Sequence, residues 1–255
     1  WERPVSLHYL DITGQKAFSI EAGISIFGNC TRNFAMKSLQ VSTKNRYLSP
    51  DIQYQVFPSL EAEEYRRMRL RSGGNHWKTS IIGEAMTHQL VEGQVDVETQ
   101  SLSSVVVYLN DAYWGIHNIR HNYSEHYFRY KFPELDTADF DLVRPRNQHS
   151  QYEVVLGTQD SLDALFTYFE NNGPFTATDY AYAQQRIDIN EWINYYIIQT
   201  WVYPTDWPNT FSPTNMIYWR PRIPNSKWRL AVLDTDGGWS NANHNTIAYM
   251  LVPGG

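Results

Sequence analysis

Short runs of alternating apolar and polar residues dominate the first half of the chain, and this alternation predicts β-strands with one buried face. A β-branched run at 104–109, the dipeptide Asn110-Asp111 and a second run at 113–119 predict a β-hairpin. Residues that favour turns, above all Gly, Asn and Ser, bound the other runs. The other strands are expected at residues 5–9, 17–26, 38–42, 52–57 and 68–71.

Apolar residues recur with helical spacing mainly in the second half, after one early stripe at 81–91. Ser161 stands where it could cap a helix with an apolar face, and Asp188 followed by Glu191 predicts a capping box. The helix behind Asp188 is apolar or aromatic on nearly all sides. We therefore expect it to be central and buried, and to end before Pro204.

The order of the elements predicts an α+β fold. Strands at 216–219 and 228–233 predict a late hairpin after the helices. We expect one domain with a β-rich lobe over about 1–120 and a helical lobe over about 121–255. The chain begins at Trp1 without a Met, so we expect a fragment of a longer chain.

Charge and composition exclude several classes of function. The chain has 21 Lys and Arg residues against 27 Asp and Glu residues, a formal net charge of −6. This balance argues against a nucleic-acid polymer as partner, but a small anion such as a nucleotide needs only a few cations. The single cysteine, Cys30, excludes an internal disulfide and a Cys-rich zinc site, and we expect it to be buried. No apolar run is long enough to span a membrane, and no signal peptide is visible.

Two acids at a strand end are the sharpest chemical feature. Asp234 and Asp236 follow a predicted strand and precede Gly237 and Gly238. Acids two apart in an extended chain point to opposite faces, so they converge only where the chain turns, which the glycines permit. Two carboxylates at a strand end suit a hard divalent cation. The alternative is a solvated Asp-rich turn.

Two glycine-containing segments are candidates for phosphate binding. Residues 28–39 form a loop led by Gly28 that carries Arg32 and Lys37 into a strand, and such a loop can hold phosphates. The second segment is the strand with Arg69 and Arg71 before its Gly-rich turn. The alternative for both is a set of surface cations.

An acid and two amides follow the long helix. Asp206 precedes Asn209 and Asn215. In phosphotransferases an Asp accepts the hydroxyl proton and a later Asn helps to hold the metal. The alternative is an ordinary polar loop, because Asp and Asn are common there.

Taken in order, these segments resemble the spore-coat protein H (CotH) kinase family. The family-like motifs include the Gly-led loop ending in Lys-Ser-Leu, a Leu-Arg turn ending in Gly-Asn, a Tyr-Trp-Gly-Ile hairpin, Asp-Trp-Pro, and a final Asp-x-Asp. In this chain they stand at residues 28–39, 70–75, 106–116, 206–219 and 228–236.

The resemblance implies an atypical protein-kinase-like, two-lobed fold. It also implies transfer of the ATP γ-phosphoryl group to Ser or Thr of a protein substrate, with Mg²⁺ or Mn²⁺, or Ca²⁺ as a further candidate. A bacterial location outside the cytoplasm, at the cell or spore surface, is implied as well. The implied site comprises catalytic Asp206 and Lys37, nucleotide-binding Lys37, Arg32, Arg71 and Asn75, and metal-binding Asn215, Asp234 and Asp236.

Four positions depart from the family pattern. The family commonly has an Asp after the turn, an Arg-Asp pair on the next helix and a Glu after the hairpin. Here these positions are His76, Gly83, Glu84 and His121. These departures leave open a catalytically degenerate module for binding or adhesion. A second alternative is a carbohydrate-binding domain, which rests on the 15% aromatic content and on the paired acids Asp234 and Asp236.

Overall fold

The chain is a mixed α and β protein that forms two compact units. The computed structural model describes residues 1–44, 47, 50–60, 64–135, 140–145, 152–173, 175–204, 207 and 215–251. Unit 1 comprises Trp1–Gln89 and Gln100–Lys131, and unit 2 comprises Leu90–Thr99 and Phe132–Gly255. None of the helices in the described residues has the length and apolar character of a membrane span.

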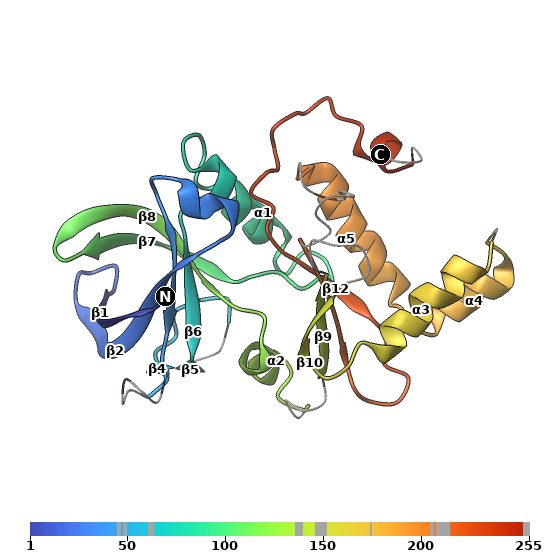
Figure 1. The fold of residues 1–255 in the computed structure, drawn as a ribbon, viewed down its shortest axis with the longest axis horizontal. Helices are drawn as coiled ribbons and strands as arrows, with labels where there is room; N and C mark the ends of the chain where they lie inside the picture. The colour runs from blue at the N-terminus through green and yellow to red at the C-terminus, as the bar shows by residue number, and fades with distance from the viewer. Residues whose placement is uncertain are drawn as a thin grey trace. The chain divides into compact units, whose positions relative to one another are not determined.

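Unit 1 is built on a six-stranded antiparallel sheet in the order β1-β2-β3-β6-β8-β7. Figure 1 shows the β7–β8 hairpin of this sheet as a long projection. The described part of this unit also contains a separate strand pair, β4 and β5, two short α-helices and two 3-10 helices. The sheet strands are β1 (Arg3–Leu10), β2 (Lys16–Phe27), β3 (Ser38–Ser42), β6 (Arg67–Arg71), β7 (Leu102–Leu109) and β8 (Ala112–His121). The remaining strands and α-helices are β4 (Ile52–Gln53), β5 (Glu64–Tyr65), α1 (Gly83–Val91) and α2 (Glu125–Lys131).

The strand pattern of unit 1 follows the sequence closely. The hairpin of β7 and β8 turns at Asn110 and Asp111, whose φ angles of 49° and 64° are those of a type I′ turn. The predicted strand at 52–57 is wrong beyond Gln53, because only the first two residues pair with β5. Apolar residues from β3, β6 and β8, including Val41 and Met68, form the buried face.

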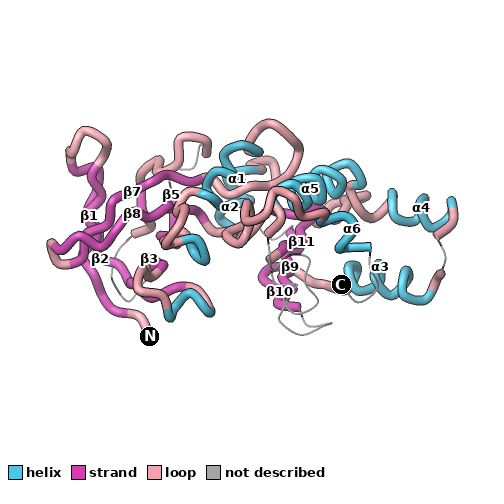
Figure 2. Tube along the Cα trace, turned by 90° about the horizontal axis from the view of Figure 1, so that it is seen from above, coloured by secondary structure: helices cyan, strands magenta, loops and turns pink. Residues whose placement is uncertain are grey.

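In its described residues, unit 2 contains a four-stranded antiparallel sheet in the order β10-β9-β11-β12 and four α-helices. The helices α3 and α4 lie side by side (Figures 1 and 2), and the Tyr168 and Tyr182 rings stack between them with centroids 3.6 Å apart. The strands are β9 (Phe140–Pro145), β10 (Tyr152–Leu156), β11 (Met216–Pro221) and β12 (Arg229–Val232). The helices are α3 (Asp160–Asn171), α4 (Ala177–Gln184), α5 (Ile189–Val202) and α6 (Thr246–Leu251).

The long helix α5 begins and ends where the sequence predicts, but it is not buried on all sides. Ile193, Ile197 and Trp201 are 51%, 59% and 57% exposed. They follow one another at four-residue spacing, so one face of α5 meets solvent. The prediction of an entirely buried helix is therefore wrong for this face.

The structure differs from both predicted helix caps. Asp188 caps α5 by accepting a hydrogen bond from the Glu191 backbone N–H at 3.3 Å. Glu191 does not complete a capping box, because both its carboxylate oxygens accept from the backbone N–H of Leu230. Ser161 lies inside α3 and not at its cap, and its hydroxyl accepts from the Trp228 indole at 3.1 Å.

Candidate functional site

The loop before β3 carries two predicted phosphate-binding residues. Arg32 is exposed on a short 3-10 helix, η1 (Cys30–Asn33). The Lys37 ammonium donates to the backbone carbonyls of Arg32 at 2.8 Å and Phe34 at 2.5 Å. Within the described part of the chain, no carboxylate pairs with Lys37. Lys37 therefore braces its own loop, and one of its three N–H groups remains for a further contact.

The start of this loop explains its glycine and corrects one prediction. Gly28 has a φ of 112°, and a Cβ there would lie 2.1 Å from the Thr31 hydroxyl oxygen. Only glycine fits this conformation without a shift of the loop. Cys30 is exposed and not buried as predicted, because it lies on η1 at the surface of the unit.

Three of the family-like segments meet in unit 1. The Ser72 hydroxyl donates to the Met36 carbonyl at 3.2 Å, which joins the turn after β6 to the loop before β3. From the hairpin, His117 Nε2 lies 3.0 Å from the Lys37 carbonyl oxygen. A Cβ on Gly115 would lie 2.3 Å from the Met36 Cε, so glycine leaves room for the methionine. These contacts place the Lys37 loop against the ends of β6 and β8.

The Gly-rich turn after β6 carries Asn75. Gly73 has a φ of 89°, and a Cβ on it would lie 2.8 Å from the Ile81 Cα, so the chain passes close to itself here. Asn75 follows in a short 3-10 helix, η3 (Gly74–His76), and is exposed. The predicted nucleotide-binding Asn75 therefore lies at the surface of unit 1.

Arg71 belongs to a buried ion-pair network. Its guanidinium contacts Glu84 Oε2 at 3.0 Å through Nη2 and at 3.2 Å through Nε. Arg120 Nη1 lies 2.6 Å from Glu84 Oε1. Glu84 stands in the first turn of α1, so the network ties this helix to β6 and β8. The alternative of a surface stripe at Arg69 and Arg71 is wrong, since both are buried and Arg69 lies 4.2 Å over the Phe27 ring.

The two arginines keep Glu84 charged in this buried position. Burial would raise the pKa of the Glu84 carboxyl, but the positive charges of Arg120 and Arg71 outweigh it and lower that pKa. The Glu84 carboxylate thus contacts two guanidinium groups, one through each of its oxygens. From the sequence alone, Glu84 is recognised only as a departure from the family pattern. Its ion pairs with Arg71 and Arg120 are found only in the folded structure.

His121, at the position of a family acid, is an aromatic core residue. Its ring stacks on Tyr127 with centroids 4.3 Å apart, and Phe57 and Tyr123 contact it edge to face. Its Nε2 accepts a hydrogen bond from the Ser101 backbone N–H at 2.9 Å. Burial lowers the pKa of His121 to about 3, so the ring is neutral. A carboxylate would lose this packing.

In unit 2 the predicted metal pair converges. One carboxylate oxygen of Asp234 and one of Asp236 lie within 4.8 Å of each other. Ligand oxygens at the usual metal distances of about 2.0–2.6 Å can both reach one cation at this separation. Asp234 has a left-handed φ of 55°, and the chain then turns at Asp236 and Gly237, where the Gly238 backbone N–H donates to the Thr235 carbonyl at 3.0 Å. The glycines therefore take part in the turn, as the sequence suggests, although neither has a left-handed φ.

Gly238 holds the acidic turn against the end of α5. A Cβ on Gly238 would lie 2.3 Å from Val202 Cγ1 and 3.0 Å from the Val202 carbonyl oxygen. The Trp239 backbone N–H donates to this carbonyl at 2.8 Å, which satisfies one of the open acceptors at the helix end. The role of this glycine is close packing.

Asn215 lies at the same end of the late hairpin as the acids. It is buried and stands one residue before Met216, which pairs with Val232 in the antiparallel register. Asp234 follows Val232 by two residues, so Asn215 and Asp234 leave the ladder together. Asn215, Asp234 and Asp236 thus all lie in unit 2, beyond the same end of the late hairpin, while the predicted catalytic Asp206 lies outside the described residues.

Comparison with known proteins gives a family. A search of curated proteins finds no match to this chain. The family model described as CotH kinase protein matches residues 24–252, nearly the whole chain. This range spans every motif on which the resemblance rests. The chain therefore belongs to the CotH kinase family.

Proposed function

We propose that this chain is a metal-dependent protein kinase that transfers the ATP γ-phosphoryl group to Ser or Thr of a protein substrate. The observation that carries the proposal is the convergence of Asp234 and Asp236 to within 4.8 Å, inside a match to a kinase family. Phosphoryl transfer needs positioning and cations on the phosphates, and it asks little covalent chemistry of the protein.

The proposed metal ligands are Asp234, Asp236 and Asn215. Carboxylate and amide oxygens are the donors that Mg²⁺ and Mn²⁺ prefer. When bound, the metal neutralises charge on the phosphates. In this proposal Asp206 accepts the proton of the acceptor hydroxyl.

The proposed nucleotide-binding residues are Lys37, Arg32, Arg71 and Asn75. Lys37 has one N–H group beyond those that bind its own loop, and Arg32 is exposed beside it. Arg71 contributes through the buried network with Glu84. As the family is named for the spore coat, we propose a surface location and a surface protein as substrate.

The test combines nucleotide binding with transfer. The whole chain is incubated with ATP and Mn²⁺ or Mg²⁺, and its mass and its melting temperature are measured. We expect a metal-dependent rise in melting temperature with ATP and addition of phosphate to the chain or to an added protein. Asp234→Asn and Asp236→Asn should abolish both.

A matched control comes from the hairpin turn. Asp111→Asn removes the same charge at a left-handed position that Asn tolerates, and it should keep full activity. Phosphate transfer that survives both Asp234→Asn and Asp236→Asn would contradict the proposed metal site.

The second candidate is a degenerate binding module. It is favoured by the occupation of two Lys37 donors by backbone carbonyls and by the neutral His121 at the family acid position. It expects a folded chain with no ATP-dependent shift in melting temperature and no transfer with either metal. A clear shift with Mn²⁺-ATP and phosphate transfer would exclude it.

A further inference from the structure

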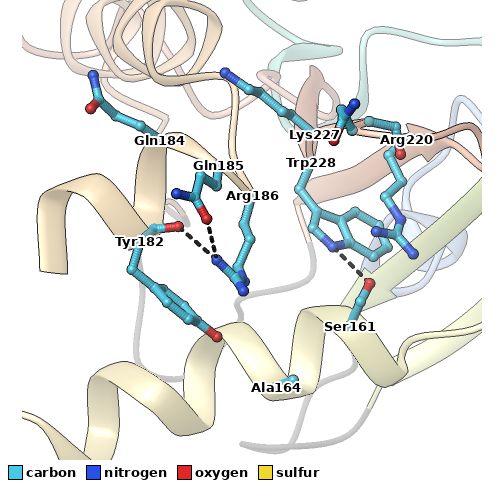
Figure 3. A pocket seen from close by; sticks show the side chains of 11 residues that line it. Ser161, Ala164, Tyr182, Gln184, Gln185, Arg186, Arg220, Lys227 and Trp228 are labelled. Atoms are coloured by element: carbon cyan, nitrogen blue, oxygen red, sulfur yellow. Dashed lines mark hydrogen bonds between the residues drawn. The ribbon is translucent and has the colours of Figure 1, made fainter. Parts of the chain in front are cut away.

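A basic cleft in unit 2 stands apart from every residue assigned above. It has a volume of about 610 Å³ and lies between α3, the chain that follows α4 and the turn of the β11–β12 hairpin (Figure 3). Three cations line it, Arg186, Arg220 and Lys227, and no Asp or Glu is among the described residues that line it. A concentration of positive charge in a concave site is unusual in a chain of net charge −6.

The walls of the cleft are fixed by hydrogen bonds. The Trp228 backbone N–H donates to the Arg186 carbonyl at 2.7 Å, and the Trp228 carbonyl accepts from the Asp188 backbone N–H at 3.0 Å and the Trp192 indole at 3.0 Å. The Trp228 indole donates to the Ser161 hydroxyl at 3.1 Å (Figure 3). A wall held in this way does not need to be ordered when a ligand binds.

Arg186 is held in place but keeps donors for a ligand. Its guanidinium lies 3.6 Å over the Tyr182 ring, and Nη1 donates to the Tyr182 carbonyl at 3.2 Å and to Gln185 at 3.5 Å (Figure 3). Within the described part of the chain, no carboxylate pairs with Arg186, and its Nε and Nη2 groups have no partner. The planar guanidinium group of Arg186 can therefore donate two parallel hydrogen bonds, through Nε and Nη2, to a tetrahedral oxyanion.

The other two cations differ in how far they are neutralised. Lys227 is exposed in the hairpin turn, and it has no ion-pair partner among the described residues. Arg220 donates to Asp141 at 2.8 Å and lies 4.9 Å over the Trp228 ring, and Asp141 is shared with Arg222 at 3.6 Å, so the charge of Arg220 is balanced only in part. Arg186 and Lys227 have no carboxylate partner among the described residues, and their two charges match a dianion better than a single carboxylate.

We propose that this cleft binds a phosphate monoester, in the form of a phosphorylated Ser or Thr side chain of a peptide. The cleft volume is in the range of sites that bind small-molecule ligands, and it has room for a phosphorylated side chain. The side-chain amides of Gln184, Gln185 and Asn225 also line it, and amides can pair with a peptide backbone. Free phosphate or a small phosphate ester would bind to the same cations, but it would make no hydrogen bonds with these amides.

The test is calorimetric titration of the whole chain at low salt, without nucleotide or metal. The probes are inorganic phosphate, O-phosphoserine, a short Gly- and Ala-based peptide with one phosphoserine, and the same peptide with serine. We expect the phosphopeptide to bind at least about tenfold more tightly than O-phosphoserine, and the serine peptide not to bind. Equal affinity for the phosphopeptide and O-phosphoserine would overturn the peptide assignment in favour of a small-anion site.

Two substitutions tie binding to the cleft. Lys227→Gln changes an exposed side chain, so it should fold normally and lower the affinity for the phosphopeptide about tenfold. Arg186→Gln should lower the phosphopeptide affinity by a similar factor. Arg186→Lys should keep part of the affinity, because lysine retains the positive charge but cannot donate two parallel hydrogen bonds. Lys16→Gln, an exposed lysine of β2, removes the same charge and should have no effect.

Three results would overturn the proposal. They are the absence of phosphopeptide binding, equal binding of the serine peptide, and unchanged affinity in Lys227→Gln. Because nucleotide and metal are left out, these results do not depend on phosphoryl transfer, and failure of the proposed kinase activity leaves the cleft proposal standing.

Discussion

Glu84 and Arg120 form a buried ion pair in unit 1, with 2.6 Å between Glu84 Oε1 and Arg120 Nη1. The Glu84 side chain is 2% exposed and the Arg120 side chain 1% exposed, so neither charge is solvated by bulk water. Arg71 contacts the other carboxylate oxygen at 3.0 Å. The Glu84 carboxylate thus contacts two buried cations, and it joins helix α1 to strands β6 and β8.

Glu84→Gln should destabilise the chain by about 3–5 kcal/mol, because it removes the negative charge that contacts the two buried guanidinium groups of Arg71 and Arg120. The midpoint of urea unfolding measures this loss. Glu125→Gln is the control, since Glu125 is 50% exposed and its ion pair with His126 is long at 3.4 Å. Equal midpoints for Glu84→Gln and Glu125→Gln would show that the network does not stabilise the fold.

Local sequence patterns predict much of this fold. The strand at 38–42 agrees with β3, and the β7–β8 hairpin follows from alternation and from a dipeptide that tolerates left-handed backbone. Alternation fails for β9, because five of its six residues are buried and such a strand shows no period of two. Helix α4 also escapes prediction, since its apolar residues form no clear stripe.

The candidate site is predictable only where its chemistry is local. Asp234 and Asp236 stand two apart, so a single turn brings them together, and the sequence displays both the acids and the turn. The partners of Glu84 are 13 and 36 positions away, and their pairing depends on how α1 packs on the sheet. The periodicity of strands and helices carries no information about such packing. From the sequence alone, Glu84 is therefore interpreted only as a departure from the family pattern.

The stability of unit 1 should fall when the pH is lowered from 7 towards 5. Burial lowers the pKa of His88 and of His121 to about 3, while the unfolded chain takes up protons near pH 6.5. Protons therefore bind to the unfolded state first, and the free energy of unfolding decreases by up to about 1.4 kcal/mol per pH unit for each histidine. Urea unfolding at a series of pH values measures the slope.

His121→Phe separates this titration from packing. The substitution keeps an aromatic ring but leaves the Ser101 N–H without its acceptor, so we expect about 1–3 kcal/mol lower stability at pH 7. The free energy of unfolding should then depend less steeply on pH between pH 7 and 5, because one of the two buried histidines no longer contributes. His126→Gln, a change in a half-buried side chain, should leave the slope as it is. An unchanged slope in His121→Phe would contradict a neutral, buried His121.

Glu191 in α5 should have the opposite effect on pH dependence. Burial raises the pKa of its carboxyl to about 8, despite the hydrogen bond from Leu230. Between pH 4.5 and 8 the unfolded chain loses the proton while the folded chain keeps it, so the free energy of unfolding falls as the pH rises. Glu191→Gln keeps the acceptor for the Leu230 N–H and removes the titration.

Melting temperatures at pH 5 and pH 8 measure this effect. Glu191→Gln should be close to the wild type at pH 5 and more stable than the wild type at pH 8, by on the order of a few kcal/mol. Glu170→Gln, on the exposed end of α3, is the matched control and should follow the wild type at both values. Loss of stability in Glu191→Gln at pH 8 would mean that the folded chain needs a charged carboxylate there.

Gly238→Ala should disturb the acidic turn, because the added methyl group would lie 3.0 Å from the Val202 carbonyl oxygen and 2.3 Å from its side chain. The turn must move away from α5, which breaks the hydrogen bond between Trp239 and Val202 and should cost about 1–3 kcal/mol. If Asp234 and Asp236 hold a metal as proposed, this shift should also weaken Mn²⁺ binding, measured by calorimetry. Gly173→Ala is the matched control, since a Cβ at Gly173 meets no atom within 4 Å. Mn²⁺ affinity that is lost in Asp236→Asn but unchanged in Gly238→Ala would show that the acids bind the ion without support from the end of α5.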